Sequence, residues 1–150
     1  MQENFNVVKY ASMLYRQCNR FYDKKLAQYH IGSGQVFPLV YIYEHDGTGM
    51  YEIVQKGCFD KGTVTKGIQK LEEQGYIRLE ADAVDRRIRR LYITPAARPI
   101  IECLYEIRQQ WIEILMNGLV ETERTQAEYL LRRMAENAWH CMSDKELDKE

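Results

Sequence analysis

The sequence of 150 residues lacks the features that mark several large classes of protein. It has no apolar run long enough to span a bilayer, and its first residues lack the basic segment of a signal peptide. Its cysteines are widely spaced, with no Cys-x-x-Cys pair: Cys18, Cys58, Cys103 and Cys141. We therefore expect a cytoplasmic protein with reduced, mostly buried thiols, no metal and no cofactor.

Catalytic motifs are also missing. The sequence has no Gly-rich phosphate loop, no nucleophile motif and no metal-ligand spacing, so it does not predict an enzyme. The net charge is only -1, and any case for nucleic acid must rest on where the charges lie. Basic residues outnumber acidic ones by eight to six over residues 60–90, whereas acidic residues outnumber basic ones by eight to five over residues 121–150. Positive charge is thus concentrated in the middle of the chain.

Hydrophobic spacing predicts a mainly α-helical fold with one small β-hairpin. The expected helices cover about residues 5–29, 36–43, 50–56, 60–75, 95–117 and 121–142, and the expected strands cover 76–79 and 91–93. Asp60 should cap the fourth helix, Gly75 should close it, and Pro38 falls inside the second helix. The first helix carries two adjacent apolar stripes, a face too wide for one neighbour. It should therefore contact several helices, including those of a partner chain.

A basic helix followed by a basic hairpin is the most informative pattern. Residues 61–71 form an amphipathic helix whose outer face bears lysine and threonine, and four of the five residues from Arg86 to Arg90 are arginine. Each feature alone also fits a solvated surface element. In this order they resemble the recognition helix and wing of a winged helix-turn-helix, which binds duplex DNA.

Four stretches of the sequence resemble the MarR family of transcription regulators. Residues 60–66 are similar to the Asp-Lys-Ser-Thr-Val-Thr-Arg start of the family's recognition helix, and residues 71–77 to its Leu-Glu-x-x-Gly-Leu-Ile exit. Residues 82–87 match the Asp-x-x-Asp-Arg-Arg wing, and residues 91–94 match the return into the fifth helix. The likeness covers about residues 10–142. The arginine often found at the place of Leu79 stands one position earlier, as Arg78.

The resemblance implies a mainly α fold with a small β-wing, that is, a winged helix-turn-helix with long N- and C-terminal dimerisation helices. It implies one domain over residues 1–142, with a winged-helix lobe at about 31–94, dimerisation helices at about 5–29 and 95–142, and a charged, frayed tail at 143–150. It also implies a homodimer that binds a palindromic operator in double-stranded DNA, in most cases as a repressor released by a small ligand or by oxidation.

Side-chain chemistry gives the expected DNA contacts their roles. On the recognition helix, Gly62 permits close approach to the groove and Gln69 suits an adenine edge. In the wing, Arg87 should enter a narrow minor groove, where Asp85 could brace its guanidinium by a bidentate pair. Arg86, Arg89 and Arg90 should contact phosphates. The full predicted set is Lys61, Gly62, Thr63, Thr65, Lys66, Gln69, Lys70, Asp85, Arg86, Arg87, Arg89 and Arg90.

A second group of residues could form an effector pocket for a small aromatic carboxylate or phenol. The candidates are Tyr15, Arg16, Tyr22, Tyr41, Tyr43, Tyr105, Arg108 and Trp111. The alternative is that these aromatic residues pack in the core or in a dimer interface, as aromatic residues at helical spacing usually do.

Two other functions remain open at this point. One is a redox-responsive regulator of the same fold, although Val8 stands where peroxide-sensing members carry their cysteine and Cys18 lies three turns later. The other is a helical dimer that has lost DNA binding and acts as a protein-interaction module. The intact arginine wing is evidence against this second alternative.

Overall fold

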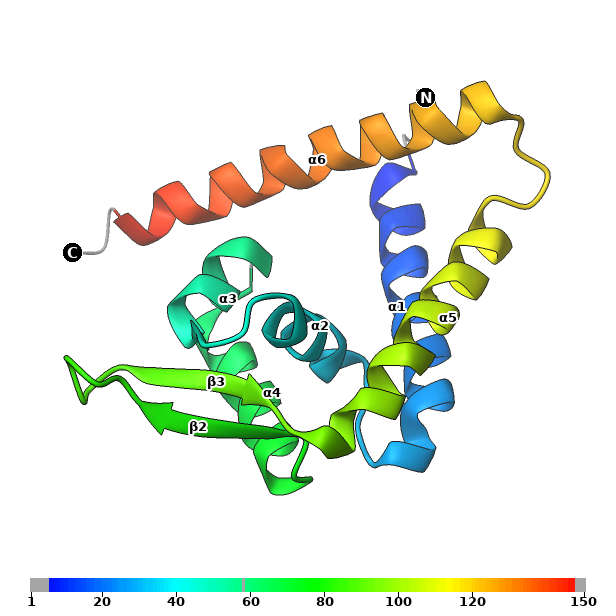
Figure 1. Ribbon diagram of the computed structural model, residues 1–150. Coiled ribbons are helices and arrows are strands. Elements are labelled where there is room, and N and C mark those ends of the chain that lie inside the picture. The colour runs from blue at the N-terminus through cyan, green and yellow to red at the C-terminus, as the bar shows by residue number, and fades with distance from the viewer. Residues whose placement is uncertain (1–5, 58, 148–150) are drawn as a thin grey trace. The chain divides into compact units, whose positions relative to one another are not determined.

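The computed structural model describes residues 6–57 and 59–147, with side chains described as far as residue 143. The helices are α1 (Val7–Leu26), α2 (Val36–Glu44), α3 (Met50–Gly57), α4 (Lys61–Glu73), α5 (Arg98–Leu115) and α6 (Glu121–Leu147). The strands are β1 (Thr48–Gly49), β2 (Ile77–Ala81) and β3 (Arg89–Ile93), and short 3-10 turns precede α2 and α5. A mainly helical fold with a small β-wing is thereby confirmed (Figure 1).

The chain divides into two compact units, Met1–Trp111 and Ile112–Glu150. The first unit holds α1 to α4, the sheet and most of α5, and it contains all of the buried hydrophobic core. The second unit holds the end of α5 and the whole of α6. None of the helices within the described residues is long and apolar enough to cross a membrane.

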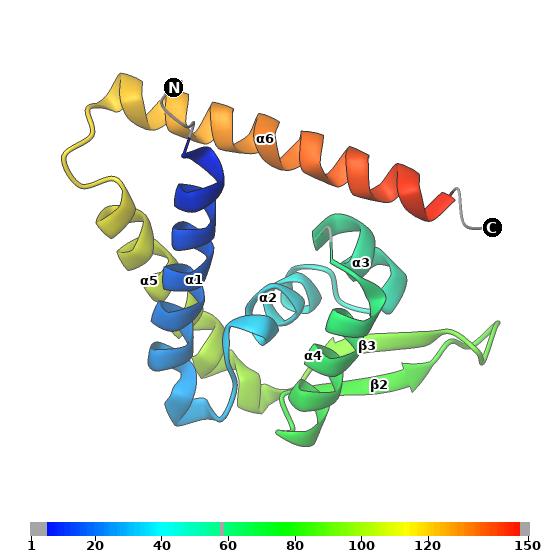
Figure 2. The same cartoon turned by 180° about the vertical axis from the view of Figure 1, so that it is seen from behind.

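A three-stranded antiparallel sheet of order β1-β3-β2 organises the first unit. Leu79 of β2 faces Leu91 of β3, and Gly49 of β1 pairs with Arg90 on the other edge of β3. The helices α2 and α4 pack against these strands (Figure 2), and their side chains Leu39, Ile68 and Leu71 are almost completely buried. The β2–β3 hairpin extends beyond α2, α3 and α4 as a wing (Figure 1).

Both ends of α4 are determined by local sequence. Asp60 caps the start, because its Oδ1 accepts a hydrogen bond of 2.8 Å from the Thr63 amide. At the other end Gly75 adopts a φ of +75°, a conformation that glycine takes at little cost. The amides of Gly75 and Tyr76 then donate to the carbonyls of Glu72 and Leu71 at 2.9 and 3.0 Å, which is a Schellman motif. The predicted cap and stop are both confirmed.

Several predicted boundaries were wrong. Pro38 lies in the first turn of α2, where it costs no helical hydrogen bond, because the residues before Val36 form a separate 3-10 turn. The cluster of turn residues before α3 contains a short strand, β1, whose hydrogen-bonding partner is the distant β3. Arg89 and Arg90 belong to β3 and not to the hairpin tip. The helix α6 continues to Leu147, so the frayed tail expected from Ser143 is absent as far as that residue.

Candidate nucleic-acid interface

The outward face of α4 is polar, while its inward face is part of the core. Val64, Ile68 and Leu71 are at most 2% exposed and fix the rotation of the helix about its axis. Gly67 faces inward as well, and a Cβ there would lie 3.1 Å from the Gly34 carbonyl oxygen. This close approach seats α4 on the turn before α2. The exposed residues of the predicted set on α4 are Lys61, Gly62, Thr63, Lys66, Gln69 and Lys70.

The N-cap of α4 also fixes the chemistry of Thr63. The Thr63 hydroxyl donates to Asp60 Oδ2 at 2.6 Å, and these two bonds from Thr63 lower the pKa of the Asp60 carboxyl. Because its proton is used in the cap, Thr63 presents a lone pair and a methyl group to any ligand. Thr65 is half-buried, since its hydroxyl donates to the Lys61 carbonyl at 2.8 Å and contacts Met50 Sδ of α3. It lies between α3 and α4 and is the least accessible of the predicted contacts on this helix.

At the wing tip, Asp85 holds Arg87 by a fork of two bonds. Arg87 Nε lies 3.1 Å from Asp85 Oδ1, and Arg87 Nη2 lies 3.1 Å from Asp85 Oδ2. The Arg87 side chain is nevertheless 91% exposed. The pair lowers the pKa of Asp85 and raises that of Arg87, so both groups stay charged. The bidentate brace predicted from the sequence is present, and it orients an exposed guanidinium.

A second aspartate shapes the wing from its base. Asp82 Oδ1 accepts hydrogen bonds from the amides of Val84 and Asp85 at 2.8 and 3.0 Å, which forms the turn. Its Oδ2 accepts a bond of 2.9 Å from Arg90 Nε, and Arg90 Nη1 also reaches the Gly47 carbonyl at 3.3 Å. Arg90 is only half-exposed and joins the wing to the loop before β1. Its guanidinium is therefore engaged within the protein, and its contact with a DNA phosphate stays a prediction.

Arg78 also takes part in the wing. Its guanidinium pairs with Glu80 on the same strand and lies 4.5 Å from the centre of the Tyr92 ring on β3. Despite the departure from the family pattern at Leu79, the wing is held by the Asp82–Arg90 pair and by the contacts of Arg78 with Glu80 and Tyr92.

The wing brace gives a measurable titration. The pKa of the Asp82 carboxyl is lowered from 3.8 to about 2, because the amides of Asp85 and Val84 and the guanidinium of Arg90 donate to its charged form. Since the folded pKa is depressed, the stabilisation is complete above pH 3.8 and is lost as the pH falls through about 2. In Arg90→Met we expect this pKa to rise only part of the way, because the two amides remain.

Carboxyl-carbon NMR can follow this titration. Asp85 is the internal control, since its lowered pKa depends mainly on Arg87 and should not move in Arg90→Met. An unchanged Asp82 titration in that variant would show that the Asp82–Arg90 pair does not form in solution.

A cavity of about 340 Å³ lies elsewhere in the first unit, between α1, α2 and α5. Its lining includes four of the eight predicted pocket residues: Tyr22, Tyr41, Tyr105 and Arg108. Its remaining lining is Val36, Phe37, Val40, Glu44 and Leu104.

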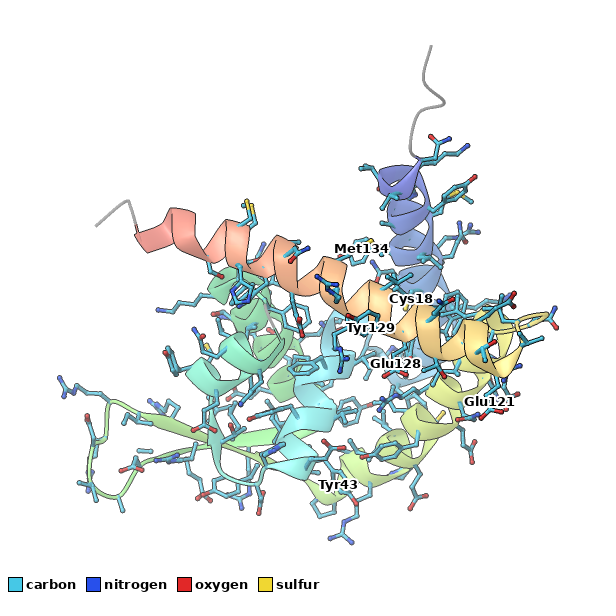
Figure 3. All side chains as sticks on the ribbon, turned by 90° about the horizontal axis from the view of Figure 1, so that it is seen from above. Cys18, Tyr43, Glu121, Glu128, Tyr129 and Met134 are labelled. Carbon is cyan, nitrogen blue, oxygen red and sulfur yellow. The ribbon has the colours of Figure 1, made fainter. Side chains whose placement is uncertain are left out.

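The other four predicted pocket residues lie outside this lining. Tyr15 is 71% exposed on α1, and Tyr43, labelled in Figure 3, is 48% exposed on α2. Arg16 is exposed, and Trp111 stacks on Phe21 with ring centroids 5.0 Å apart. Tyr15 and Trp111 share a helix face with the lining residues Tyr22 and Arg108, but they lie two turns earlier along α1 and one turn further along α5.

The cysteines differ from the sequence-based expectation. None of the three that the structure describes is fully buried: Cys18 and Cys103 are half-buried and Cys141 is exposed, while Cys58 lies outside the described residues. Burial raises the pKa of the Cys18 thiol, whereas a redox sensor needs a lowered one. Within the described residues, no three His, Cys, Asp or Glu side chains gather as metal ligands.

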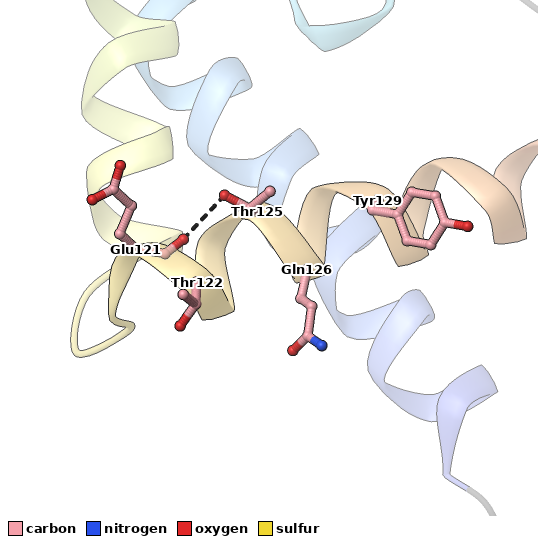
Figure 4. Close-up of a pocket in the computed structure, with 5 residues that line it drawn as sticks. All are labelled: Glu121, Thr122, Thr125, Gln126 and Tyr129. Atoms are coloured by element: carbon pink, nitrogen blue, oxygen red, sulfur yellow. Dashed lines mark hydrogen bonds between the residues drawn. The ribbon is translucent and has the colours of Figure 1, made fainter.

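The second unit has a surface depression of its own at the start of α6. Figure 4 shows its lining, Glu121, Thr122, Thr125, Gln126 and Tyr129, along one stretch of this helix. The Thr125 hydroxyl donates to the Glu121 carbonyl at 3.1 Å, as Ser and Thr side chains commonly do inside helices. All these residues but one are polar, and a single helix supplies them.

Sequence reasoning missed three residues that matter for these sites. Asp82 was assigned only to the wing motif. The missed signal is that an aspartate at the start of a turn commonly accepts a hydrogen bond from the backbone amide two residues later. Gly67 had no signal apart from its place on the apolar face of α4. Glu44 could not be found, because its neighbour Tyr105 is 61 residues away in the sequence.

An exposed recognition helix, a braced arginine wing and two long flanking helices define a winged helix-turn-helix regulator. Residues 32–88 match the model of the MarR family. A MarR transcriptional regulator from Methanosarcina mazei Go1 is 31% identical, with a TM-score of 0.81 over 92% of this chain and 99% of that one. The chain belongs to the MarR family and is a DNA-binding transcription regulator, not an enzyme.

A further relative agrees with this assignment, and a further solved structure shares the fold. The HTH-type transcriptional regulator YybA of Bacillus subtilis is 24% identical over 132 residues, which is 88% of each chain. The fold is also that of S. aureus MepR in its DNA complex, with a TM-score of 0.82, 24% identity, and coverage of 89% of this chain and 99% of that one.

Proposed function

We propose that this chain represses transcription by binding a palindromic operator as a homodimer, and that a small ligand releases it. The observation that carries the proposal is the pairing of two basic surfaces in one unit. These are the exposed polar face of α4 and the guanidinium of Arg87, which Asp85 holds at the tip of the wing.

The two surfaces suit two grooves of a duplex. In the major groove we assign Thr63, Lys66, Gln69 and Lys70, with Gln69 on an adenine edge and the lysines on guanine or phosphate. Lys61, Gly62 and the start of α4 lie where a helix N-terminus favours a phosphate. In the minor groove we assign Arg87, with Arg86 and Arg89 on the flanking phosphates. S. aureus MepR, which shares the fold, was crystallised with DNA, and this supports duplex DNA as the partner.

A homodimer is supported by the apolar side chains that the long helices leave exposed. No residue of α6 is buried as far as Ser143, although Tyr129, Leu130, Leu131 and Met134 are 43–51% exposed. Tyr129 and Met134 are labelled in Figure 3. In α1, Val8 is 77% exposed and Tyr15 is 71% exposed. Apolar surface of this extent marks an interaction site.

These faces belong to the elements that we assign to dimerisation, at about 5–29 and 95–142, while residues 31–94 form the DNA-binding lobe. The palindrome follows from the twofold symmetry of such a dimer, whose recognition helices should lie about 34–36 Å apart. Operator DNA is found in the cytoplasm of a bacterial or archaeal cell, and we propose that location.

The cavity between α1, α2 and α5 is the proposed effector site. Its aromatic lining would accept a small aromatic ring, and Arg108 would face an anionic group such as a carboxylate or a phenolate. A ligand there touches three helices at once, including α1 and α5 of the proposed dimer lobe. It could therefore shift the DNA-binding lobe relative to the dimer axis.

DNA binding should depend steeply on salt. Each neutralised phosphate releases a counterion, so a plot of log K against log salt should have a slope of about −0.9 per phosphate contact. We expect a steep slope on a random duplex, and tighter binding with a similar slope on a duplex recovered by oligonucleotide selection. Fluorescence polarisation at several salt concentrations measures both. A flat plot would rule out the proposed groove contacts.

A further inference from the structure

The cavity between α1, α2 and α5 has an apolar, aromatic floor. Leu104 is 2% exposed and Tyr22 is 9% exposed, while Val36, Phe37 and Val40 are partly buried against the core. The Phe37 and Tyr41 rings stack with centroids 5.6 Å apart. A volume of about 340 Å³ is at the lower end of the range of roughly 300–1,000 Å³ that holds small ligands. The floor therefore suits one aromatic ring.

The rim of the same cavity carries charges of both signs. Glu44, the last residue of α2, accepts a hydrogen bond of 2.8 Å from the Tyr105 hydroxyl of α5. Arg108, one turn further along α5, is exposed and makes no hydrogen bond or ion pair with any residue that the structure describes. In particular, Glu44 and Arg108 do not pair with each other. The rim of the cavity thus carries a negatively charged hydrogen-bond acceptor, Glu44, and a separate positive charge, Arg108.

We propose that the effector is amphoteric: an aromatic ring that carries an anionic group for Arg108 and, on the same molecule, an ammonium or N–H donor for Glu44. This inference rests on the proposed ligand-release function and narrows its ligand class. A simple aromatic carboxylate would satisfy Arg108 and give the Glu44 carboxylate no donor beyond the Tyr105 hydroxyl. A simple aromatic amine would pair with Glu44 and leave Arg108 without an anionic partner.

The electrostatics of the rim agree with this assignment. The pKa of the Tyr105 hydroxyl is raised, chiefly because that hydroxyl donates to Glu44, and the nearby charge of Arg108 opposes the rise. Arg108 also lowers the pKa of Tyr22, on the floor, although burial raises it more. Both rim charges therefore act on Tyr105, and Arg108 acts on Tyr22 as well. A group that pairs with each would be bound more tightly there than a group that pairs with one.

Three probes of matched shape test the proposal by calorimetry on the full chain without DNA. They are 4-(aminomethyl)benzoate, 4-methylbenzoate and 4-methylbenzylamine, with the 3-substituted isomers in parallel to cover a shorter separation of the two groups. We expect the zwitterion to bind about tenfold more tightly than either singly charged probe, the effect of one hydrogen bond to a charged group. Equal or tighter binding of 4-methylbenzoate would overturn the amphoteric class, and so would the absence of binding by every probe.

Two variants test which residue binds each charged group of the ligand. Glu44→Gln keeps an oxygen that can accept from Tyr105 but removes the negative charge, so the zwitterion should fall to the affinity of 4-methylbenzoate. Arg108→Gln should lower it to the affinity of 4-methylbenzylamine. Circular dichroism and thermal melting show that each variant is folded. If neither substitution changes the preference, the proposal is wrong.

DNA binding by the unliganded wild-type chain is measured separately. A regulator that binds its operator but shows no preference for the zwitterion contradicts this inference and leaves the proposed DNA-binding function standing.

Discussion

Arg87→Ala should weaken operator binding by about 1–3 kcal/mol, the usual effect of removing one specific groove contact. Arg87 is 91% exposed at the wing tip, and the fork from Asp85 already restricts its rotamers, so little further entropy is lost on binding. Fluorescence polarisation on a selected duplex gives the affinity. Sedimentation at the same concentration should show an unchanged oligomeric state, because Arg87 is exposed at the wing tip, outside the buried core and outside the segments that we assign to dimerisation.

Two matched variants separate charge from geometry. Arg87→Lys keeps the charge but cannot form the bidentate pair with Asp85, so it should recover only part of the affinity. Arg86→Ala removes a neighbouring arginine that has no such brace, and it should mainly reduce the salt slope by about one. Equal affinities for wild type and Arg87→Ala would mean that the wing does not enter the minor groove.

Leu71→Ala should lower the free energy of unfolding by about 2–5 kcal/mol, which is the range for truncating a fully buried leucine. Leu71 is completely buried on the inward face of α4. The cavity left behind would loosen the recognition helix from the core. Urea unfolding at one fixed protein concentration measures the change, since the stability of a dimer depends on concentration.

Gln69→Ala is the control on the same helix. Gln69 is exposed and supports no core contact, so its removal should change stability by no more than about 0.5 kcal/mol. It should instead reduce the discrimination between operator and random duplex. If Leu71→Ala proved as stable as wild type, the inward face assigned to α4 would be wrong.

The sequence was most informative where a signal is local. The limits of α4 were predictable because Asp60 and Gly75 act on backbone groups within a few residues of themselves. The Asp85–Arg87 fork was predictable for the same reason, since its two residues are two apart. Pro38 shows the limit of such reasoning. The proline was seen, but the 3-10 turn that places it in the first turn of α2 has a distant partner, since the Ser33 amide donates to Asp23 of α1.

Long-range contacts decided the remaining features. Arg90 was one arginine among four in the sequence, and only the strand pairing that brings Gly47 and Asp82 to it makes it a structural brace. Tyr22, Tyr41 and Tyr105 could be named as aromatic candidates, but Tyr15 and Tyr43 had equal standing until the helices were placed. Periodicity predicts which face of a helix is apolar, but it does not predict which other element packs against that face.

By itself, the sequence determined the class of this protein. The order of its helices and turns, the apolar faces and the charged wing are properties of neighbouring residues, and they specify a winged helix-turn-helix. Only the tertiary structure decided that Arg87 is exposed while Arg90 is held between Asp82 and Gly47, and that Glu44 and Arg108 share one cavity. The physical reason is that a side chain's role depends on its partners, and these partners lie 8 to 61 residues away along the chain.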